Sequence, residues 1–151
     1  MEKLIQVFCT VAAAALLAGC SGKSEDKIPG PVAFDPGAKG QVFVKGEKEP
    51  LKFCSVKDGF VYVLQPENAK RTVGFWVSDF GNKKDIPLHE KMLLAQKAFF
   101  NAGSDVRGAM GKSILPFATK EEVQAFTKEH GGTIVNYSEV NLGLLKSLKG
   151  H

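Results

Sequence analysis

The fold is decided by the stretch Phe53-Cys54-Ser55-Val56-Lys57-Asp58, whose pattern returns 64 residues later as Phe117-Ala118-Thr119-Lys120-Glu121-Glu122. Each copy has the end of an apolar strand, then a hydroxyl residue, then an acid three residues after the hydroxyl. This is the pattern of a capping box, in which the hydroxyl accepts from the amides of the first helical turn and the acid returns to the cap. The repeat therefore predicts two helices that begin at equivalent places in two similar units.

The sequence on either side of each box matches as well. Around the first box we expect two strands, a helix ended by Pro66 and a third strand, at Gln41–Lys45, Leu51–Phe53, Val56–Gln65 and Arg71–Phe80. Around the second box the same order gives elements at Ala98–Ala102, Ile114–Phe117, Lys120–His130 and Thr133–Tyr137. Gly131-Gly132 predicts a left-handed end to the second helix. Ser138 predicts the start of a last helix, Glu139–Leu148.

These elements predict the α+β class, with two similar ββαβ units packed together. One unit cannot cover both faces of its small sheet, so the two should share a core. The alternative is two unrelated α+β segments that share a capping box by chance. We divide the chain into an export signal at 1–19, a flexible Gly- and Pro-rich tether at 20–40, the first unit at 41–81, a connector at 82–97, and the second unit with its C-terminal helix at 98–151.

The first twenty residues have the features of a bacterial lipoprotein signal. Lys3 precedes the apolar stretch Leu4–Leu17, which is too short to cross a bilayer as a helix. The stretch ends in Leu17-Ala18-Gly19-Cys20, which resembles the lipobox, whose cysteine sulfur receives a diacylglycerol. The alternative is an ordinary cleaved signal with an incidental cysteine. We therefore expect a lipoprotein anchored to a membrane of the cell envelope and facing the periplasm, and Ser21 slightly favours the outer membrane.

Charge and cysteine content narrow the class of protein further. The formal net charge is +4, but the basic residues are scattered and mixed with acids, which is typical of a solvated surface and indicates no nucleic-acid partner. Cys9 leaves with the signal and Cys20 carries the lipid, so Cys54 is the remaining thiol of the mature chain. An intramolecular disulfide is therefore excluded, and the fold must depend on its core.

Enzyme signatures are mostly absent, and we expect a protein that is not an enzyme. The sequence has no phosphate-binding glycine loop, no nucleophile elbow, and no HExxH or CxxC motif. The histidines His89, His130 and His151 are far apart and in polar surroundings. His130 lies beside the double glycine, where it would favour a helix C-terminus, so we expect it to have a surface role.

Two sulfur residues are candidate metal ligands. Cys54 ends a strand and precedes a helix start, where partial positive charge favours a thiolate. Met110 lies in the glycine-flanked polar loop Ser104–Gly111. A thiolate and a thioether together suit a soft ion, Cu(I) above all. The alternatives are that Cys54 is a small buried hydrophobe and that Met110 packs in the core, as we expect of Met92.

Several motifs together resemble the NosL family. They are Leu51–Asp58, Leu64–Asn68, Gly103–Gly111, Leu115–Ala118 and Ala125–Gly132 with the strand that follows, and the resemblance covers about Gly37 to Val140. It implies a lipoprotein of two similar ββαβ units that binds Cu(I) and delivers copper to the clusters of nitrous oxide reductase. Cys54 and Met110 are the positions that match the family's motifs. His89, in its own loop, is a candidate third ligand.

Two segments depart from the family pattern. NosL proteins usually carry a Cys-Gly-Met motif just ahead of the Pro-Gly that opens the first strand. Here that region reads Ile28-Pro29-Gly30-Pro31-Val32-Ala33-Phe34-Asp35-Pro36-Gly37, without either sulfur ligand. The usual Trp-Ile-Asp-Ala before the second unit is replaced by Met92-Leu93-Leu94-Ala95. The resemblance therefore predicts the whole fold but only part of the family's copper site.

The sequence leads to the hypothesis of a lipid-anchored, Cu(I)-binding accessory protein, a metallochaperone that carries copper as cargo for nitrous oxide reductase maturation. Its partners would be nitrous oxide reductase or the copper assembly machinery of that enzyme. An alternative is a NosL-like module that has lost metal binding and acts as a protein-binding partner in the cell envelope. A third reading, a thiol enzyme using Cys54, lacks an identifiable resolving cysteine or base.

Overall fold

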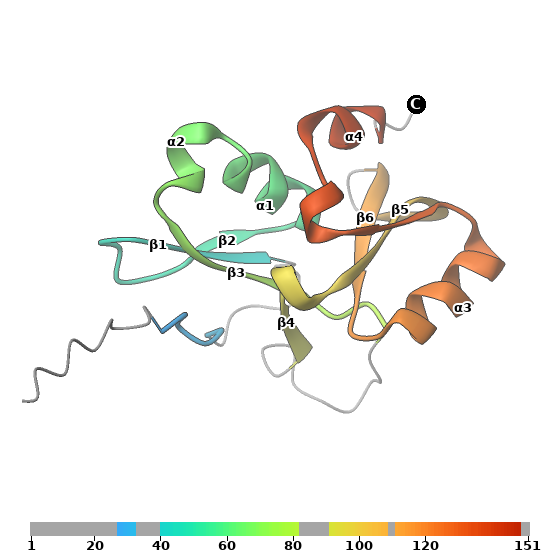
Figure 1. The fold of residues 1–151 in the computed structure, drawn as a ribbon, viewed down its shortest axis with the longest axis horizontal. Coiled ribbons are helices and arrows are strands. Elements are labelled where there is room, and N and C mark those ends of the chain that lie inside the picture. Colours follow the sequence, from blue (N-terminus) through green and yellow to red (C-terminus); the bar gives the residue numbers. More distant parts are fainter. Residues whose placement is uncertain (1–26, 33–39, 82–90, 109–110, 149–151) are drawn as a thin grey trace, which may run out of the picture.

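A computed structural model describes residues 27–32, 40–81, 91–108 and 111–148 of the chain. Figure 1 shows two small sheets that lie side by side, with helices packed on them. Within the described ranges, no helix is long and apolar enough to cross a membrane.

The first unit is built on an antiparallel sheet with the strand order β2-β1-β3-β4. Its elements are β1 (Gly40–Val44), β2 (Leu51–Phe53), α1 (Val56–Val63), α2 (Pro66–Ala69), β3 (Thr72–Ser78) and β4 (Met92–Leu94). Because side chains alternate along a strand, Val42 and Val44 of β1 face the core and α1, whereas Gln41 and Phe43 face the opposite side of the sheet.

The second unit repeats this arrangement with the strand order β6-β5-β7. Its elements are β5 (Phe99–Gly108), β6 (Gly111–Phe117), α3 (Lys120–His130) and β7 (Thr133–Asn136), followed by α4 (Leu142–Ser147). In both units the first strand lies in the middle, the second forms a hairpin with it, and the strand after the helix pairs on the other side. The predicted α+β class with two similar ββαβ units is confirmed.

The helices begin where the two capping boxes predicted. Ser55 Oγ accepts from the Asp58 amide at 3.0 Å, and Thr119 Oγ1 accepts from the Glu122 amide at 3.2 Å. The second box is complete, because the Glu122 carboxylate accepts from the Thr119 amide at 3.1 Å. In the first box, the Asp58 carboxylate instead accepts from the Ser55 hydroxyl at 2.8 Å.

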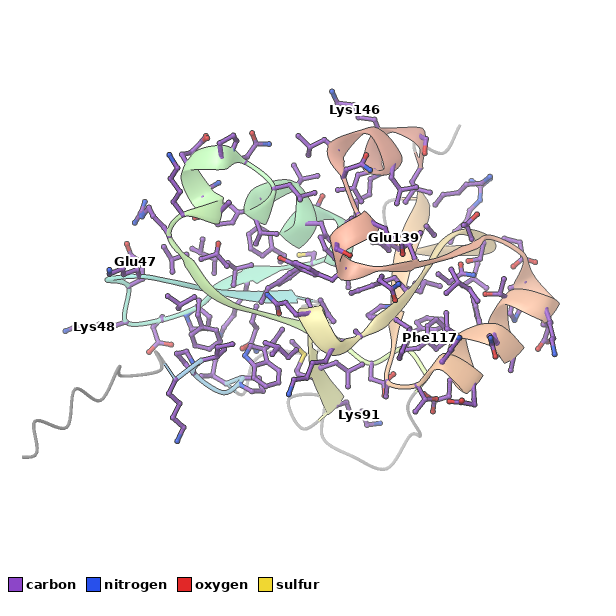
Figure 2. The ribbon with its side chains drawn as sticks, viewed as in Figure 1. Glu47, Lys48, Lys91, Phe117, Glu139 and Lys146 are labelled. Atoms are coloured by element: carbon purple, nitrogen blue, oxygen red, sulfur yellow. The ribbon has the colours of Figure 1, made fainter. Side chains whose placement is uncertain are left out.

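A small aromatic core fills the space between α3 and the second sheet. It contains Leu115, Phe117 and Val123, and Phe117 is labelled in Figure 2. Phe80, which follows β3 of the first unit, lies with its ring centre 5.8 Å from Phe117 and 5.5 Å from Phe126. The Phe80 amide also donates to Pro116 O at 2.7 Å, so this residue connects the first unit to the second.

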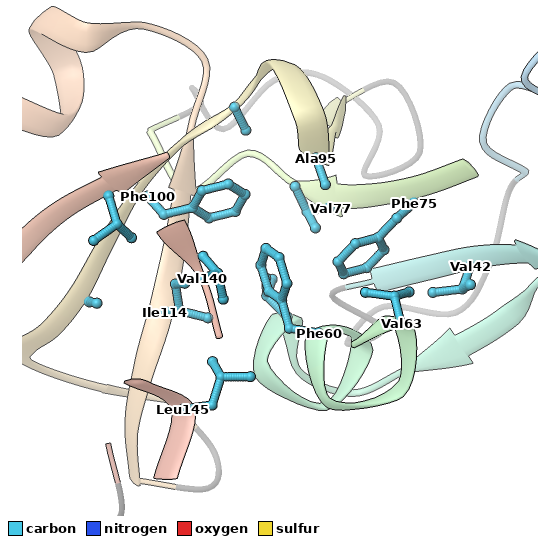
Figure 3. Packing of buried hydrophobic residues seen from close by; sticks show 14 of the residues in the cluster. Val42, Phe60, Val63, Phe75, Val77, Ala95, Phe100, Ile114, Val140 and Leu145 are labelled. Carbon is cyan, nitrogen blue, oxygen red and sulfur yellow. The ribbon is translucent and has the colours of Figure 1, made fainter. Parts of the chain in front are cut away.

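The main core is shared by the two units, as predicted. Phe60 of α1 lies at its centre and is fully buried (Figure 3). Its ring meets Phe75 of the first sheet edge-on, with 5.1 Å between ring centres, and Phe100 of the second sheet with 5.2 Å. The helix of the first unit therefore packs between both sheets, and neither unit has a complete core without the other.

Three elements differ from the sequence-based expectations in the first unit and the connector. α1 ends at Val63, and Pro66 begins α2, because proline fits the first helical position, where its missing amide hydrogen is not needed. Met92–Leu94, expected within a connector, forms β4 on the edge of β3 and gives the exposed backbone groups of that edge their partners. Met92 is buried, in agreement with the packing role expected for it.

The hairpin of the second unit is longer than predicted. β5 runs to Gly108 and β6 starts at Gly111, so most of the expected polar loop is strand. The strand register shifts between Ala102 and Arg107. Gly103 lies in this interval with a φ of +79°, which glycine adopts without strain. This irregularity lets a polar segment continue the sheet, a feature that hydrophobic alternation does not reveal.

The C-terminal helix starts later than predicted. Asn141, rather than Ser138, caps α4, and its side chain accepts from the Leu144 amide at 3.0 Å. Ser138 lies instead in a short 3-10 turn, η3 (Tyr137–Glu139). This segment packs on the main core, where Val140, Leu145 and Leu148 are buried. Gly131 and Gly132 both have positive φ, as expected, although the ψ of −159° at Gly131 lies outside the left-handed helical region.

Residues 27–32, here called the N-terminal strap, pack on the face of the first sheet opposite α1, below β1 and β3 in Figure 1. The side-chain amide of Gln41 accepts from Val32 N at 3.0 Å and donates to Val32 O at 2.7 Å. Trp76 Nε1 donates to Pro29 O at 2.8 Å. A Cβ at Gly74 would lie 2.5 Å from the Ile28 side chain, so glycine makes room for the strap. This part of the expected flexible tether is therefore held against the sheet.

Candidate functional site

Cys54 lies in the sharp turn between β2 and α1. Ser55 is extended, with φ −136° and ψ 150°, and its side chain caps α1, so the chain changes direction next to the cysteine. On the other side of Cys54, the ring of Phe53 packs against Tyr62 with 5.5 Å between ring centres. These contacts fix both flanks while the Cys54 side chain stays exposed. The exposure contradicts the alternative of a small buried hydrophobe and leaves the sulfur open to a ligand or partner.

The other two candidate ligands, Met110 and His89, lie outside the described residues, as does the lipid acceptor Cys20. The strands on either side of Met110 in the sequence are described up to Gly108 and again from Gly111. Gly108 and Gly111 are paired across the hairpin, and Gly111 has a φ of +93°. In the sequence, Met110 is one of the two residues that join β5 to β6.

Contacts through α4 bring the first turn of α1 to this hairpin. Lys57 Nζ donates to Leu148 O at 3.3 Å. Leu148 also lies against β5, since a Cβ at Gly103 would be 3.2 Å from its Cδ2 atom. In addition, α1 packs directly against β6. The first turn of α1, which follows the Cys54 turn, is thus joined to the β5–β6 hairpin both by direct packing and through the buried residue Leu148.

In the described part of the chain, no three His, Cys, Asp or Glu side chains are grouped so that they could hold a metal ion. His130 Nδ1 lies 3.0 Å from Asp105 Oδ1, and the His130 ring packs on Phe126 with 4.5 Å between ring centres. His130 therefore lies at the partly exposed end of α3, within hydrogen-bonding distance of Asp105 of β5, in line with the expected surface role.

Among the residues that the structure describes, Asp79 and Tyr137 have clearly shifted pKa values. Burial raises the pKa of Asp79 above its ordinary value, and the nearby Glu122 carboxylate raises it further. The Gly81 amide, which donates to Asp79 Oδ1 at 3.0 Å, acts in the opposite direction. Burial also raises the pKa of Tyr137. Asp79 directly precedes Phe80, whose ring contacts Phe117 of the second unit, so Asp79 lies next to the contact between the two units.

The N-terminal strap was missed by sequence reasoning, and it occupies part of the region in which the NosL resemblance called for a Cys-Gly-Met motif. Its Pro29 and Val32 are held by Trp76 and Gln41 on the sheet face opposite α1. The one sequence signal was Gln41, a polar residue inside a buried strand, where a side-chain amide needs partners.

Comparisons with known proteins agree with this architecture. The model of the NosL family matches residues 31–145. The copper-binding lipoprotein NosL of Stutzerimonas stutzeri is 32% identical over 147 residues, covering 86% of this chain and 76% of the relative. The protein of the same name from Achromobacter cycloclastes is 33% identical over 109 residues, and the match covers 70% of this chain and 56% of that protein.

Solved structures show the same fold. The crystal structure of the copper chaperone NosL from Shewanella denitrificans matches with a TM-score of 0.66 and 30% identity, over 72% of this chain and 81% of that one. The solution structure of apo-NosL from Achromobacter cycloclastes matches with a TM-score of 0.51 and 28% identity, over 71% and 88% of the two chains. On its sequence and its fold, the chain belongs to the NosL family.

Proposed function

We propose that this protein is a copper chaperone of the cell envelope, which binds Cu(I) and passes it on for nitrous oxide reductase maturation. The main support for the proposal is the similarity of the sequence and fold, over most of the chain, to copper-binding lipoproteins and to a copper chaperone. The exposed Cys54 supports it, together with Met110 between β5 and β6 in the sequence, because a thiol and a thioether are donors that Cu(I) prefers. His89 is the proposed third ligand.

The proposed mechanism is ligand exchange without redox chemistry. A sulfur at the surface can be approached by a ligand of the acceptor before its own bond to copper is released, so the ion never has to enter water. The rigid flanks of Cys54 support this role, since the cap at Ser55 and the Phe53–Tyr62 contact hold the turn in place. No catalytic group is required, which fits a protein that is not an enzyme.

The proposed location follows from the lipobox and from lipoprotein relatives. Cys20 would carry the lipid, with the folded part facing the periplasm, at the outer membrane in preference to the inner one. The proposed acceptors are nitrous oxide reductase or its copper assembly machinery.

The proposal is tested by titrating the protein with Cu(I) against a chromophoric Cu(I) chelator under reducing conditions. We expect one equivalent to bind, Cys54→Ser to abolish binding, and Met110→Leu to weaken it less, because a neutral thioether contributes less than a thiolate. Met92→Leu is the matched control, since Met92 is buried in β4 and its thioether accepts from Ser78 Oγ at 3.5 Å. Curves of the wild type and Cys54→Ser that superimpose would exclude Cys54 as a ligand, and if neither protein takes copper from the chelator, the chain is instead a binding module without metal.

A further inference from the structure

The N-terminal strap is held on the first sheet by contacts at both of its ends. Near its end, the buried side-chain amide of Gln41 bonds both the N–H and the C=O of Val32. Near its start, the indole of Trp76 donates to Pro29 O. The fixed φ of Pro29 and Pro31 lowers the conformational entropy that the strap loses when it docks. The strap therefore fixes the place at which the chain enters the folded part.

The strap and the helices lie on opposite faces of the first sheet. Gln41 and Trp76 are partners across β1 and β3, so their side chains share the face that carries the strap. Val42 and Phe75 are partners on the other face, where they pack with α1. Cys54 immediately precedes the N-cap of α1, at the edge where the sheet continues into the helix layer. Figure 1 shows the strap below this sheet and α1, α2 and α4 above it.

The connection between the proposed lipid and the strap is short. Six residues, 21–26, separate the proposed lipid acceptor Cys20 from Lys27, the first residue of the strap. Even when fully extended, this connection spans only about 25 Å. Without a docked strap, the connection would run from Cys20 to Gly40 and could span about 70 Å. Docking of the strap therefore shortens the reach of the anchor almost threefold.

This reach decides which side of the domain can lie against a membrane. A compact domain of about 100 residues has a radius of gyration of about 13 Å, so it is roughly 35 Å across and about 55 Å around half of its circumference. A connection of about 25 Å is too short to pass around the domain and place the helix side on the bilayer. A connection of about 70 Å would permit either side. The docked strap therefore selects the side that carries it.

The surface around the strap also suits a lipid interface. It is formed by Ile28, Pro29, Gly74 and Trp76, and we call it the strap face. Ile28 is 38% exposed, and Trp76 is partly exposed. Both side chains lie against Gly74, so they form one apolar surface. Indole and aliphatic side chains favour the boundary between water and the acyl chains of a bilayer.

We propose that the strap face lies against the membrane surface, so that the α1 side of the domain, with Cys54, is presented to the periplasm. The inference rests on the proposed lipid anchor at Cys20. It deepens the proposed copper function, because an exposed thiol on the side away from the bilayer is open to a copper donor or acceptor in the periplasm. The strap acts as a clamp that turns a flexible anchor into an oriented one.

The test uses the full lipoprotein without copper, reconstituted in phosphatidylcholine vesicles. Energy transfer from Trp76, the single tryptophan, to dansyl-labelled headgroups gives the distance of the strap face from the membrane surface. Transfer from fluorescein on Cys54 to rhodamine-labelled headgroups gives the distance of the α1 side. We expect Trp76 to be the nearer of the two by about 10 Å or more, because a helix layer about 10 Å thick separates the two sides.

Two variants release the strap by different means. Gly74→Val introduces a side chain that clashes with Ile28, while valine itself suits a strand. Gln41→Leu removes both bonds to Val32 and keeps a side chain of similar size in the sheet. A red shift of Trp76 emission in neutral detergent verifies the release, since the indole loses its bond to the strap.

Each release variant should lower the energy transfer from Trp76 by about threefold or more. The reason is that the root-mean-square length of the connection rises from about 15 Å to about 25 Å, and energy transfer falls steeply with distance. The matched control is Leu51→Val. Leu51 is exposed and lies opposite Val42, so it belongs to the α1 side, and this change should leave the transfer from Trp76 as it is in wild type.

Equal transfer from Trp76 in wild type and in both release variants would overturn the proposal, because the strap would then not set the distance. So would a dye on Cys54 that lies nearer to the headgroups than Trp76. A wild type that is dimeric in neutral detergent, with monomeric release variants, would assign the strap face to a second copy of the chain and also overturn it. A wild type that does not sediment with vesicles would remove the anchor and the orientation together. The Cu(I) titration needs no vesicle and tests the copper function separately.

Discussion

Replacing Phe60 by alanine should be the most damaging single change in the shared core. The side chain is 0% exposed and lies between rings of both units, at 5.1 Å from Phe75, 5.2 Å from Phe100 and 5.5 Å from Tyr137. Truncation of a buried phenylalanine costs about 3–5 kcal/mol. We expect a loss of about 4 kcal/mol, in the upper half of that range, because two sheets bound the cavity and it cannot collapse freely. Aromatic pairs lost with the ring add to the cost.

The same variant tests whether the two units unfold together. Trp76, the single tryptophan, reports on the first sheet, while far-UV circular dichroism includes α3 of the second unit. In urea we expect both signals to share one midpoint and to shift together in Phe60→Ala. The control is Val61→Ala on the same helix, which is 39% exposed and should change the unfolding free energy by less than about 0.5 kcal/mol. A loss below about 1.5 kcal/mol in Phe60→Ala, or separate midpoints for the two signals, would refute the shared core.

Three further predictions concern the caps, the lipid and a partly buried acid. Thr119→Ala and Ser55→Ala should each lower the unfolding free energy by about 1 kcal/mol in urea denaturation, and unchanged midpoints would contradict the capping role. Cys20→Ser should remove labelled fatty acid from the protein, and equal labelling of both forms would exclude this cysteine as the acceptor. Asp79 has a pKa raised in the folded state, so its contribution to stability is fully present below the unfolded value of 3.8 and is lost as the pH rises through the folded pKa. The unfolding free energy of Asp79→Asn relative to wild type should therefore be higher at neutral pH than at pH values below 3.8. A difference between the two proteins that does not depend on pH would contradict the raised pKa.

Local chemistry allowed much of the fold to be read from the sequence. The boxes at Ser55 and Thr119 depend on residues three positions apart, so the starts of α1 and α3 could be predicted without knowledge of the partner elements. The two units followed from the repetition of this local signal. Cys54 could likewise be placed between a strand end and a helix start, and the structure has it there and exposed.

Features that depend on distant residues appeared only in the tertiary structure. Met92–Leu94 is a strand because the edge of β3 offers backbone partners. The strap is held on the sheet by Gln41, nine residues after Val32, and by Trp76, 47 residues after Pro29. The polar half of the β5–β6 hairpin lacks the hydrophobic alternation from which a strand is predicted. Its pairing register places Arg107 opposite Lys112. Sequence spacing determines which residues share a helix turn or strand face, whereas pairing and burial between separate segments depend on the packed chain. The connection of the first turn of α1 to the hairpin is of this second kind, since it is made in part by Leu148, which lies 91 residues after Lys57 in the chain.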